Sequence, residues 1–286
     1  MPPRKPSRVG SHIPTGPGLL KSLTYAAEIG AQAVQVFVSN PRGWAPSLGD
    51  AEQDERFATT CATAGIPVYV HAPYLVNFGS PNEATRRHSV EAVTHAMRRG
   101  MAIGAKGVVV HAGSAVASSH YDEAMAGLRR HLLPLLDEAH PDGPKLLVEP
   151  TAGGGHALCS TVDELGPWFA QLDAHPMLGV CLDTCHLFAA GHDLAAPGGM
   201  KRALDLLVKT VGRGRLGLVH ANDSRDRLGS GRDRHAPIGQ GAIGADPFAE
   251  LFRHPATRGV PVVVETPGDA ASHRRDIDLL CSLRDS

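Results

Sequence analysis

The sequence is poor in aromatic residues and in cysteine, and it has no excess of either charge. Aromatic side chains make up 5% of the 286 residues, and the five cysteines follow no repeating spacing. An odd, scattered set of cysteines argues against a disulfide-stapled secreted domain and favours a reducing compartment. With 28 Lys plus Arg against 29 Asp plus Glu, the chain lacks the basic field that binds nucleic acid by charge alone. Any contact with DNA or RNA would come from a local patch.

Long apolar runs are also missing. No stretch approaches the ~18 apolar residues that a membrane helix requires, so we expect a soluble, cytoplasmic protein without a membrane partner. The first residues are basic and proline-rich with no apolar segment behind them, which predicts a disordered tail over 1–7 rather than a signal peptide. No low-complexity linker interrupts the rest, so 8–286 is expected to form one domain. The sequence leaves the oligomeric state open, and a monomer is our working expectation.

Eight short runs are candidate strands. Seven are apolar on both faces, as in parallel strands that are buried on both sides, and the run at 8–13 is weaker and is interpreted as a strand mainly from its position. They span residues 8–13, 33–38, 67–70, 107–110, 145–149, 178–183, 216–220 and 260–265. Helical patterns lie between them at 18–29, 50–64, 122–139, 162–172, 199–210, 246–253 and 269–283. A further helix is expected to start with Ser80 as its N-cap, Pro81 at its first position and Glu83 completing a capping box. This alternation predicts a parallel sheet, either open or closed into a barrel.

The strand ends decide between these two architectures. A histidine, aspartate or glutamate ends each of six successive strands: His71, His111, Glu149, Asp183, His220 and Glu265. An open sheet gathers its ligands at one switch point, whereas a closed barrel brings all strand ends around one centre. Strand ends that simply meet water would show a wider mixture of polar residues. The sequence therefore predicts a single-domain (β/α)8 TIM barrel with a metal cluster at the C-terminal face of its strands.

The stretch CLDTCHLFAAG, which begins at Cys181, holds four side chains that could bind metal. Cys181 and Asp183 share one face of the strand, with Cys181 deeper, so we expect the cysteine to be a buried core residue. Cys185 has no second thiol near another strand end, and a thiolate site usually needs several. His186 can return over the barrel mouth from the following turn. We therefore interpret Asp183 and His186 as ligands and both cysteines as packing residues.

The long segment after His220 adds further candidates. Asp233 and His235 form a D-x-H pair that can bind one ion, although the spacing alone is weak. Four arginines occupy the same segment, and beside a metal cluster they could hold a polyanionic backbone: Arg225, Arg227, Arg232 and Arg234. A solvated charged loop is the alternative. His12, near the end of the first run, is expected to line the same pocket.

Nine candidate ligands are too many for one ion and suffice for two or three. Imidazole and carboxylate without thiolate suit Zn²⁺, with Mn²⁺ or iron as alternatives, and disfavour Mg²⁺ and Ca²⁺. Clustered divalent ions stabilise the negative charge that develops when a phosphodiester is attacked, and they generate hydroxide near neutral pH. A phosphodiester hydrolase is therefore the predicted reaction class.

Several segments resemble the endonuclease IV (deoxyribonuclease IV) family of apurinic/apyrimidinic endonucleases. They are HAPYLVNFGSP, VVHAGS, VEPTAGGG, GVCLDTCHLFAAGHDL, LVHANDS, DRHAPIGQGAIG and VVVETPG, in order from about residue 8 to 283. The resemblance implies a TIM barrel with three zinc ions, Mn²⁺ being an alternative at one site. The implied activity cuts DNA on the 5′ side of abasic sites, leaves a 3′-hydroxyl, trims blocked 3′ ends and serves base excision repair.

The resemblance also implies roles for individual residues. His71, His111 and Glu149 would hold the first zinc; Glu149, Asp183, His220 and Glu265 the second; and His186, Asp233 and His235 the third, with Glu149 as the catalytic bridge. Tyr74, Arg42 and Trp44 would contact the DNA. Gly43 and Pro150 depart from the Gln and Asn found in relatives, and neither is expected to touch a metal ligand.

Two other functions remain open on the sequence. A sugar isomerase or epimerase on the same barrel also gathers His, Glu and Asp at its strand ends, but it has no use for the D-x-H pair or the arginine-rich loop. A non-catalytic metal-binding or DNA-binding module is the second alternative.

Overall fold

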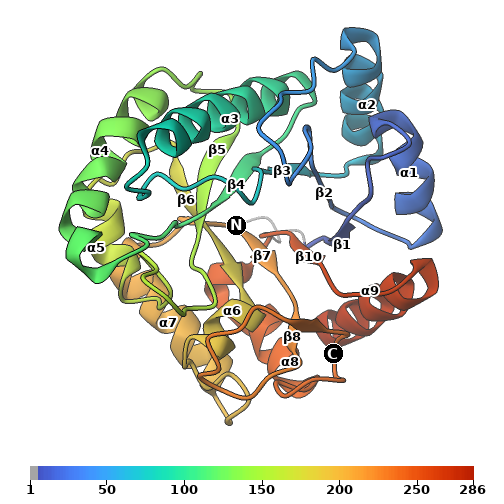
Figure 1. The fold of residues 1–286 in the computed structure, drawn as a ribbon. Helices are drawn as coiled ribbons and strands as arrows, with labels where there is room; N and C mark the ends of the chain where they lie inside the picture. The colour runs from blue at the N-terminus through green and yellow to red at the C-terminus, as the bar shows by residue number, and fades with distance from the viewer. Residues whose placement is uncertain (1–5) are drawn as a thin grey trace.

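Eight parallel strands close into a barrel in the computed structural model, which describes residues 6–286 (Figure 1). The barrel strands are β1 (Val9–His12), β2 (Val34–Val36), β3 (Val68–His71), β4 (Gly107–His111), β5 (Lys145–Glu149), β6 (Leu178–Asp183), β7 (Leu216–His220) and β10 (Val262–Val264). Around the barrel their order is β1-β10-β7-β6-β5-β4-β3-β2. The predicted TIM barrel and its eight strands are confirmed.

Helices follow the strands and form the outer layer in Figure 1. They are α1 (Leu19–Glu28), α2 (Ala51–Ala64), α3 (Glu83–Ala102), α4 (Tyr121–Asp137), α5 (Leu165–Ala170), α6 (Thr184–Ala189), α7 (Gly199–Val211), α8 (Asp246–Arg253) and α9 (Ala270–Asp285), with short 3₁₀ turns at Ser118–His120 and Pro255–Thr257. A two-strand hairpin, β8 (Asp223–Ser224) with β9 (His235–Ala236), lies outside the barrel sheet. Within residues 6–286, no helix combines the length and the apolar character that crossing a membrane takes.

The start of α3 differs from the prediction. Asn82, not Ser80, is its N-cap, and the Asn82 side chain accepts a hydrogen bond from the Thr85 amide at 3.1 Å. The Ser80 hydroxyl instead accepts from the Asn82 amide at 3.2 Å. Serine and asparagine are equally good N-caps, and here the serine forms the turn that leads into the helix.

The expected tail lies mostly outside the described residues, which begin at Pro6. Ser7, the last residue assigned to that tail, is buried, and its hydroxyl donates to the Thr257 carbonyl at 2.8 Å. The packed part of the chain therefore begins no later than Ser7.

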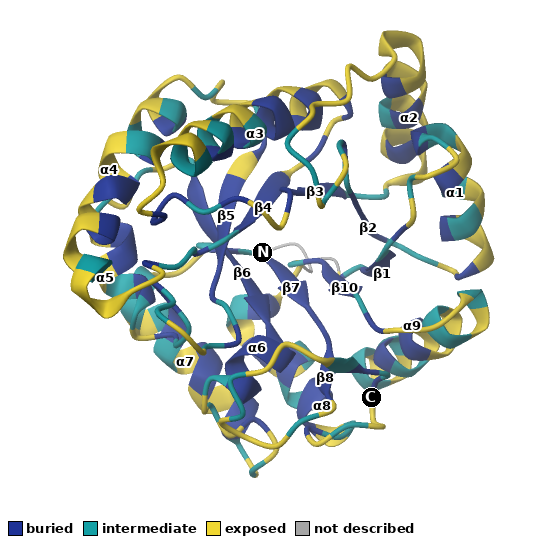
Figure 2. Ribbon diagram, in the orientation of Figure 1, coloured by how far each residue is buried: buried dark blue, intermediate teal, exposed yellow. Residues whose placement is uncertain are grey.

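The core has two layers. The larger lies between the strands and the buried faces of the helices (Figure 2). The smaller fills the barrel interior with seven side chains: Ala33, Tyr69, Val109, Leu147, Cys181, Leu218 and Val263. Alternate residues of a strand share a face, so the residues two positions later also face the interior: Gln35, His71, His111, Glu149, Asp183, His220 and Glu265. The barrel thus has an apolar floor and a polar ring above it.

Candidate metal centre

The strand register brings the six predicted strand-end residues together. His111 lies directly beside Glu149 on neighbouring strands, and Asp183 lies directly beside His220. Glu149, Asp183 and His220 are almost completely shielded from solvent. A carboxylate is rarely buried without a compensating cation or hydrogen bonds. The negative charge of this ring therefore has to be balanced within the ring or by a bound cation, because the apolar layer beneath it offers neither charge nor donors.

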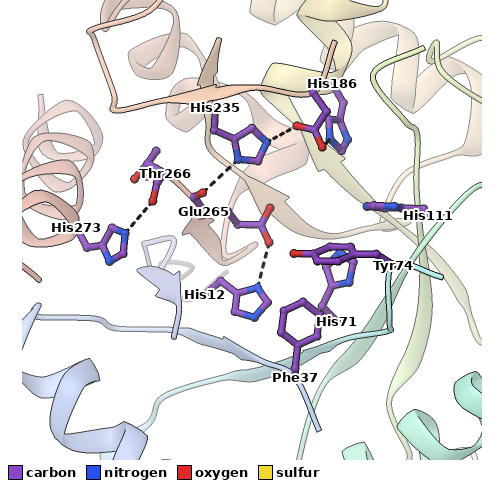
Figure 3. Close-up of a pocket in the computed structure, with 11 residues that line it drawn as sticks. His12, Phe37, His71, Tyr74, His111, His186, His235, Glu265, Thr266 and His273 are labelled. Atoms are coloured by element: carbon purple, nitrogen blue, oxygen red, sulfur yellow. Dashed lines mark hydrogen bonds and ion pairs between the residues drawn. The ribbon is translucent and has the colours of Figure 1, made fainter. Parts of the chain in front are cut away.

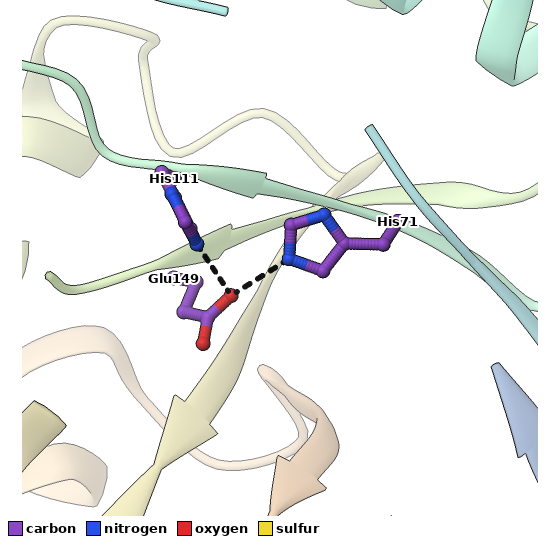
Figure 4. A group of neighbouring side chains, drawn as sticks. All are labelled: His71, His111 and Glu149. Atoms are coloured by element: carbon purple, nitrogen blue, oxygen red, sulfur yellow. Dashed lines mark ion pairs between the residues drawn. The ribbon is translucent and has the colours of Figure 1, made fainter. Parts of the chain in front are cut away.

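The first group joins His71, His111 and Glu149 at the ends of β3, β4 and β5 (Figure 4). Both Nε2 atoms face the same carboxylate oxygen, Glu149 Oε2, at 3.4 Å from His71 and 3.6 Å from His111. The His71 Nδ1 donates to the Ala72 carbonyl at 2.7 Å, which leaves its Nε2 as the free lone pair.

The second group lies around the other oxygen of Glu149. It consists of Glu149, Asp183, His220 and Glu265. His220 Nδ1 is 3.0 Å from Glu149 Oε1, 3.2 Å from Glu265 Oε2 and 3.9 Å from Asp183 Oδ2. The two oxygens of Glu149 face different groups. Within residues 6–286, it is the only predicted ligand that belongs to both the first and the second group.

The third group forms where α6 meets the hairpin. Asp233 lies between two imidazoles, 3.2 Å from His186 Nε2 and 2.9 Å from His235 Nε2. His235 Nε2 is also 3.6 Å from Asp183 Oδ2. The His186 Nδ1 donates to the Pro150 carbonyl at 3.0 Å. The expectation that Pro150 touches no ligand was therefore wrong, although the contact is made by the backbone and would survive a change of side chain.

Local structure fixes the two segments that carry the third group. Asp183 is the N-cap of α6, and its Oδ1 accepts from the His186 amide at 3.0 Å. The hairpin is bound to the end of the same helix, because the Gly229 and Gly231 amides donate to the Phe188 and Ala189 carbonyls at 3.1 and 3.0 Å. The D-x-H segment is thereby held over His186.

A cavity of about 510 Å³ opens above these groups. It is lined by His12, Phe37, His71, Tyr74, His111, His186, Asp233, His235, Glu265, Thr266 and His273 (Figure 3). His12 lines the pocket as expected, with Nδ1 3.2 Å from Glu265 Oε1. Tyr74 is half-exposed at the mouth, and its ring centroid lies 6.0 Å from that of His111.

The residues present fit divalent metal ions. Among residues 6–286, six buried side-chain atoms have no partner in hydrogen-bond geometry, and two of them belong to predicted ligands: Glu149 Oε2 and His235 Nε2. The second of these lies 2.9 Å from Asp233 Oδ1 as an ion-pair contact. A set of imidazole and carboxylate donors without thiolate is the chemistry of zinc sites in enzymes. Buried ligand atoms without a hydrogen-bond partner are expected in a protein whose side chains bind a metal ion at that place.

The protonation states of the histidines also fit a site for divalent cations. Burial lowers the pKa of His111 to about 4, so its ring is neutral. Burial opposes protonation of His186 too, but the Asp183 and Asp233 carboxylates raise its pKa to about 10. Against the same burial effect, Asp183 and Asp233 raise the pKa of His235 to about 9. Protons on these rings balance the buried carboxylates, and a divalent cation that binds here would displace them.

The two cysteines of the CLDTCHLFAAG stretch are buried, as expected for packing residues. Their sulfurs do lie near donor atoms: Cys181 beside Glu149 and His220, and Cys185 beside Asp233 and His235. Burial, however, raises the pKa of both thiols to about 12. Cys181 belongs to the apolar layer beneath the ring, and Cys185 is fully buried with no second thiol in its group, so we assign both side chains to the core.

The predicted DNA contacts occupy different settings. Arg42 is exposed, whereas Trp44 is partly buried against the core, with its ring 5.3 Å from that of His88 on α3. The Tyr74 amide donates to the Pro41 carbonyl at 3.0 Å. The two loops that carry Arg42, Trp44 and Tyr74 are therefore joined at the rim of the cavity.

The four arginines of the hairpin are exposed, but they are not equivalent. Arg234 forms a two-pronged ion pair with Asp226, with Nε 2.7 Å from Oδ2. Arg232 lies 3.9 Å from the same carboxylate. Arg225 and Arg227 have no ion pair within residues 6–286. The hairpin thus presents two unpaired guanidinium groups and two that share one aspartate.

Two supporting residues were not predicted. Asn222 is buried, donates to Asp183 Oδ2 at 2.7 Å and accepts from the Glu265 amide at 2.8 Å. Gln35 is also buried and contacts both His220 and Glu265. The sequence contains a signal for Gln35, because it is the single polar residue of an apolar strand. It also lies two positions after an interior residue, as the members of the polar ring do.

Comparison with known proteins identifies the family. Residues 23–283 match the family described as Xylose isomerase-like TIM barrel. The chain is 58% identical over 285 residues to the Probable endonuclease 4 of Streptomyces coelicolor, covering 99% of this chain and 96% of the relative. For the Probable endonuclease 4 of Streptomyces avermitilis the identity is 58% over 279 residues, covering 97% and 90%. The crystal structure of endonuclease IV from Thermus thermophilus matches with a TM-score of 0.82 at 32% identity, covering 97% of this chain and 99% of that one. The chain therefore belongs to the endonuclease IV family, on the Xylose isomerase-like TIM barrel.

Proposed function

We propose that this protein is a zinc-dependent endonuclease that hydrolyses the phosphodiester on the 5′ side of an abasic site in duplex DNA and leaves a 3′-hydroxyl. It works as a monomer in base excision repair and also trims blocked 3′ ends. The observation that supports this most is the convergence of nine His, Asp and Glu side chains in three groups, two of which share Glu149. Membership of the endonuclease IV family supports it independently.

Each of the three groups would hold one zinc ion. His71, His111 and Glu149 would hold the first, Glu149, Asp183, His220 and Glu265 the second, and His186, Asp233 and His235 the third. Mn²⁺ is an alternative to zinc at one of the three sites. Bound zinc supplies a hydroxide nucleophile near neutral pH and neutralises negative charge on the phosphate. The chain's own task is to hold the ligands in place, and the backbone contacts of His71, His186 and His235 do this.

Residues at the rim would position the DNA. Tyr74 stands over His111 at the cavity mouth, and Arg42 and Trp44 occupy the loop bonded to it. The hairpin arginines approach the phosphate backbone from the other side: Arg225, Arg227, Arg232 and Arg234. Guanidinium groups suit this role because they bind phosphate with paired hydrogen bonds.

The decisive experiment uses one end-labelled duplex with a single abasic site, and the same duplex undamaged as its control. We expect one cut 5′ to the site, a product that a DNA polymerase can extend, and loss of cutting after prolonged chelation. No cleavage of the abasic duplex by protein that contains its zinc would overturn the proposal. Metal-dependent turnover of a sugar in place of DNA would support the isomerase alternative, and tight DNA binding without cleavage would support a binding module.

The metal content is a direct prediction. Nine ligands with one shared carboxylate should hold about three ions per chain. We expect elemental analysis of protein purified without added metal to find about three zinc-equivalents. Brief EDTA treatment should inhibit weakly, because buried sites with several ligands release metal slowly. At most one tightly bound ion, or complete inactivation within seconds, would contradict the arrangement.

The hairpin arginines should act on DNA binding rather than on metal. Replacing Arg232 or Arg234 with alanine should weaken binding and flatten its salt dependence, because removing one charge from the phosphate backbone reduces the slope by roughly one unit. The Arg234 change also frees Asp226 and should have the larger effect. Binding is measured from 50 to 200 mM salt with metal content as the control. Unchanged slopes in both variants would exclude Arg232 and Arg234 as contacts to the phosphate backbone.

A further inference from the structure

Three of the candidate ligand histidines are oriented in the same manner. In each, Nδ1 lies against a backbone carbonyl: His71 against Ala72 at 2.7 Å, His186 against Pro150 at 3.0 Å, and His235 against Glu265 at 3.2 Å. A carbonyl only accepts hydrogen bonds, so Nδ1 carries a proton in each ring, and Nε2 is the atom whose lone pair a metal ion would use after displacing any second proton. These acceptors are backbone carbonyls, so a change of side chain at Ala72, Pro150 or Glu265 would not remove them.

His220 is the exception. Its Nδ1 faces the carboxylates of Glu149 and Glu265, and its Nε2 lies 2.9 Å from Oε1 of Gln35. Here the tautomer depends on a side chain. Gln35 is fully buried and belongs to β2, a strand that contributes no predicted metal ligand.

The contacts of Gln35 fix the orientation of its amide. The Nε2 atom lies 2.7 Å from Glu265 Oε1 and 2.9 Å from His12 Nδ1. A ligand carboxylate is ionised and only accepts, so the atom beside it must be the amide nitrogen. The amide oxygen then faces His220 and can only accept, so Nε2 of His220 carries a proton. A metal ion that binds between the carboxylates of Glu149 and Glu265 would take the lone pair of Nδ1 and displace the proton that faces them.

We propose that Gln35 is a positioning residue for the second metal group, where it sets the tautomer of His220 and holds one oxygen of Glu265. A single amide thereby aligns two ligands of one group while contacting neither of the other two groups. The hydrogen bond to Glu265 Oε1 leaves Oε2, the oxygen nearer to His220, directed toward the ion site. This inference rests on the proposed function, since it takes the second group to be a metal site.

The test compares Gln35→Met, Gln35→Glu and the control Gln32→Met. Methionine matches the length of glutamine without its polar atoms. Glutamate keeps an acceptor for His220, and its second oxygen, when protonated, can still bond to Glu265. Gln32 lies just before the same strand at the opposite end of the barrel, where its side chain accepts from Arg284 at 3.0 Å, so it controls for the loss of an amide away from the site.

The readouts are zinc content and zinc release to a chromophoric chelator, with the nitrogen chemical shifts of His220 reporting its tautomer. We expect Gln35→Met to lose one ion of the three, with affinity at that site about 10–100-fold lower, and the other two retained. Gln35→Glu should recover most of that affinity and keep the proton on Nε2 of His220. Gln32→Met should match the wild type.

The outcomes separate the two levels of inference. If the wild-type chain binds about three ions and cleaves abasic DNA, but Gln35→Met keeps all three with wild-type affinity, the role of Gln35 is wrong and the proposed function stands. Loss of all ions, or equal losses in Gln35→Met and Gln35→Glu, would also reject it. If Gln35→Met does not fold, the metal content and His220 tautomer of Gln35→Glu decide. A wild-type chain without zinc would instead overturn the proposed function.

Discussion

Replacing Glu149 with glutamine is expected to lower kcat on abasic-site DNA by at least ~10³, while the protein still folds and binds DNA. Glu149 is buried, and each of its oxygens faces a different group: Oε2 toward His71 and His111, and Oε1 toward His220. Glutamine keeps the shape but loses the charge and one acceptor oxygen. It can therefore serve one group and not both.

The measurement is single-turnover cleavage beside DNA affinity and zinc content. Glu138→Gln makes the same chemical change at an exposed position beyond the end of α4 and should behave as wild type. DNA affinity should change far less than kcat, because the rim residues are untouched. A Glu149 variant that retained more than a tenth of wild-type cleavage would show that this residue is not the bridge, and the metal assignment would need to be redrawn.

Asp223 should give the largest effect on stability, although it is not a metal ligand. Its buried carboxylate accepts hydrogen bonds from five backbone amides at 2.8–3.3 Å, and these belong to Ser224, Gly239, Gly241, Ile243 and Gly244. Truncation to alanine leaves several of these donors without a partner, at ~1–3 kcal/mol each. We expect Asp223→Ala to lower the free energy of unfolding by roughly 4 kcal/mol or more, a large share of the ~5–15 kcal/mol typical of a protein.

The loss is measured by urea denaturation, together with hydrogen exchange of residues 237–244. Asp278→Ala, which removes an exposed carboxylate from α9, is the matched control and should change stability little. The turn is closely fitted, since a Cβ atom at Gly241 would collide with the Ser224 carbonyl and the Asp223 side chain. A loss below about 1 kcal/mol, with unchanged exchange, would mean that the turn does not depend on this carboxylate.

The barrel and the six strand-end residues of the ring could be predicted because both follow from short-range patterns. Runs that are apolar on both faces mark buried strands, and His, Asp or Glu at the ends of such runs must meet at one face once the barrel closes. Gln35 obeys the same alternation but was missed, because glutamine is not among the residue types that commonly bind metal or protons. An amide that orients a ligand leaves a weaker signal than the ligand itself.

Other features needed the folded chain. Helix α6 was not predicted because all six of its residues are buried, so the sequence shows no polar face and no helical period. The contact of His186 with the Pro150 carbonyl joins segments that lie 36 residues apart, and no side-chain pattern records a backbone acceptor. The pairing of Arg234 with Asp226 depends on the hairpin, whose two strands have only two residues each.

The bonds between the hairpin and α6 have a consequence for how the gene can change. Surface loops usually tolerate insertions and deletions, but here the Gly229 and Gly231 amides satisfy carbonyls at the end of the helix that carries His186. Adding or removing a residue between Gly231 and Asp233 would displace Asp233 and His235 relative to His186 on that helix. We therefore expect related proteins to keep the length of this loop while the exposed residues in it vary. In most surface loops the length varies as readily as the residues do.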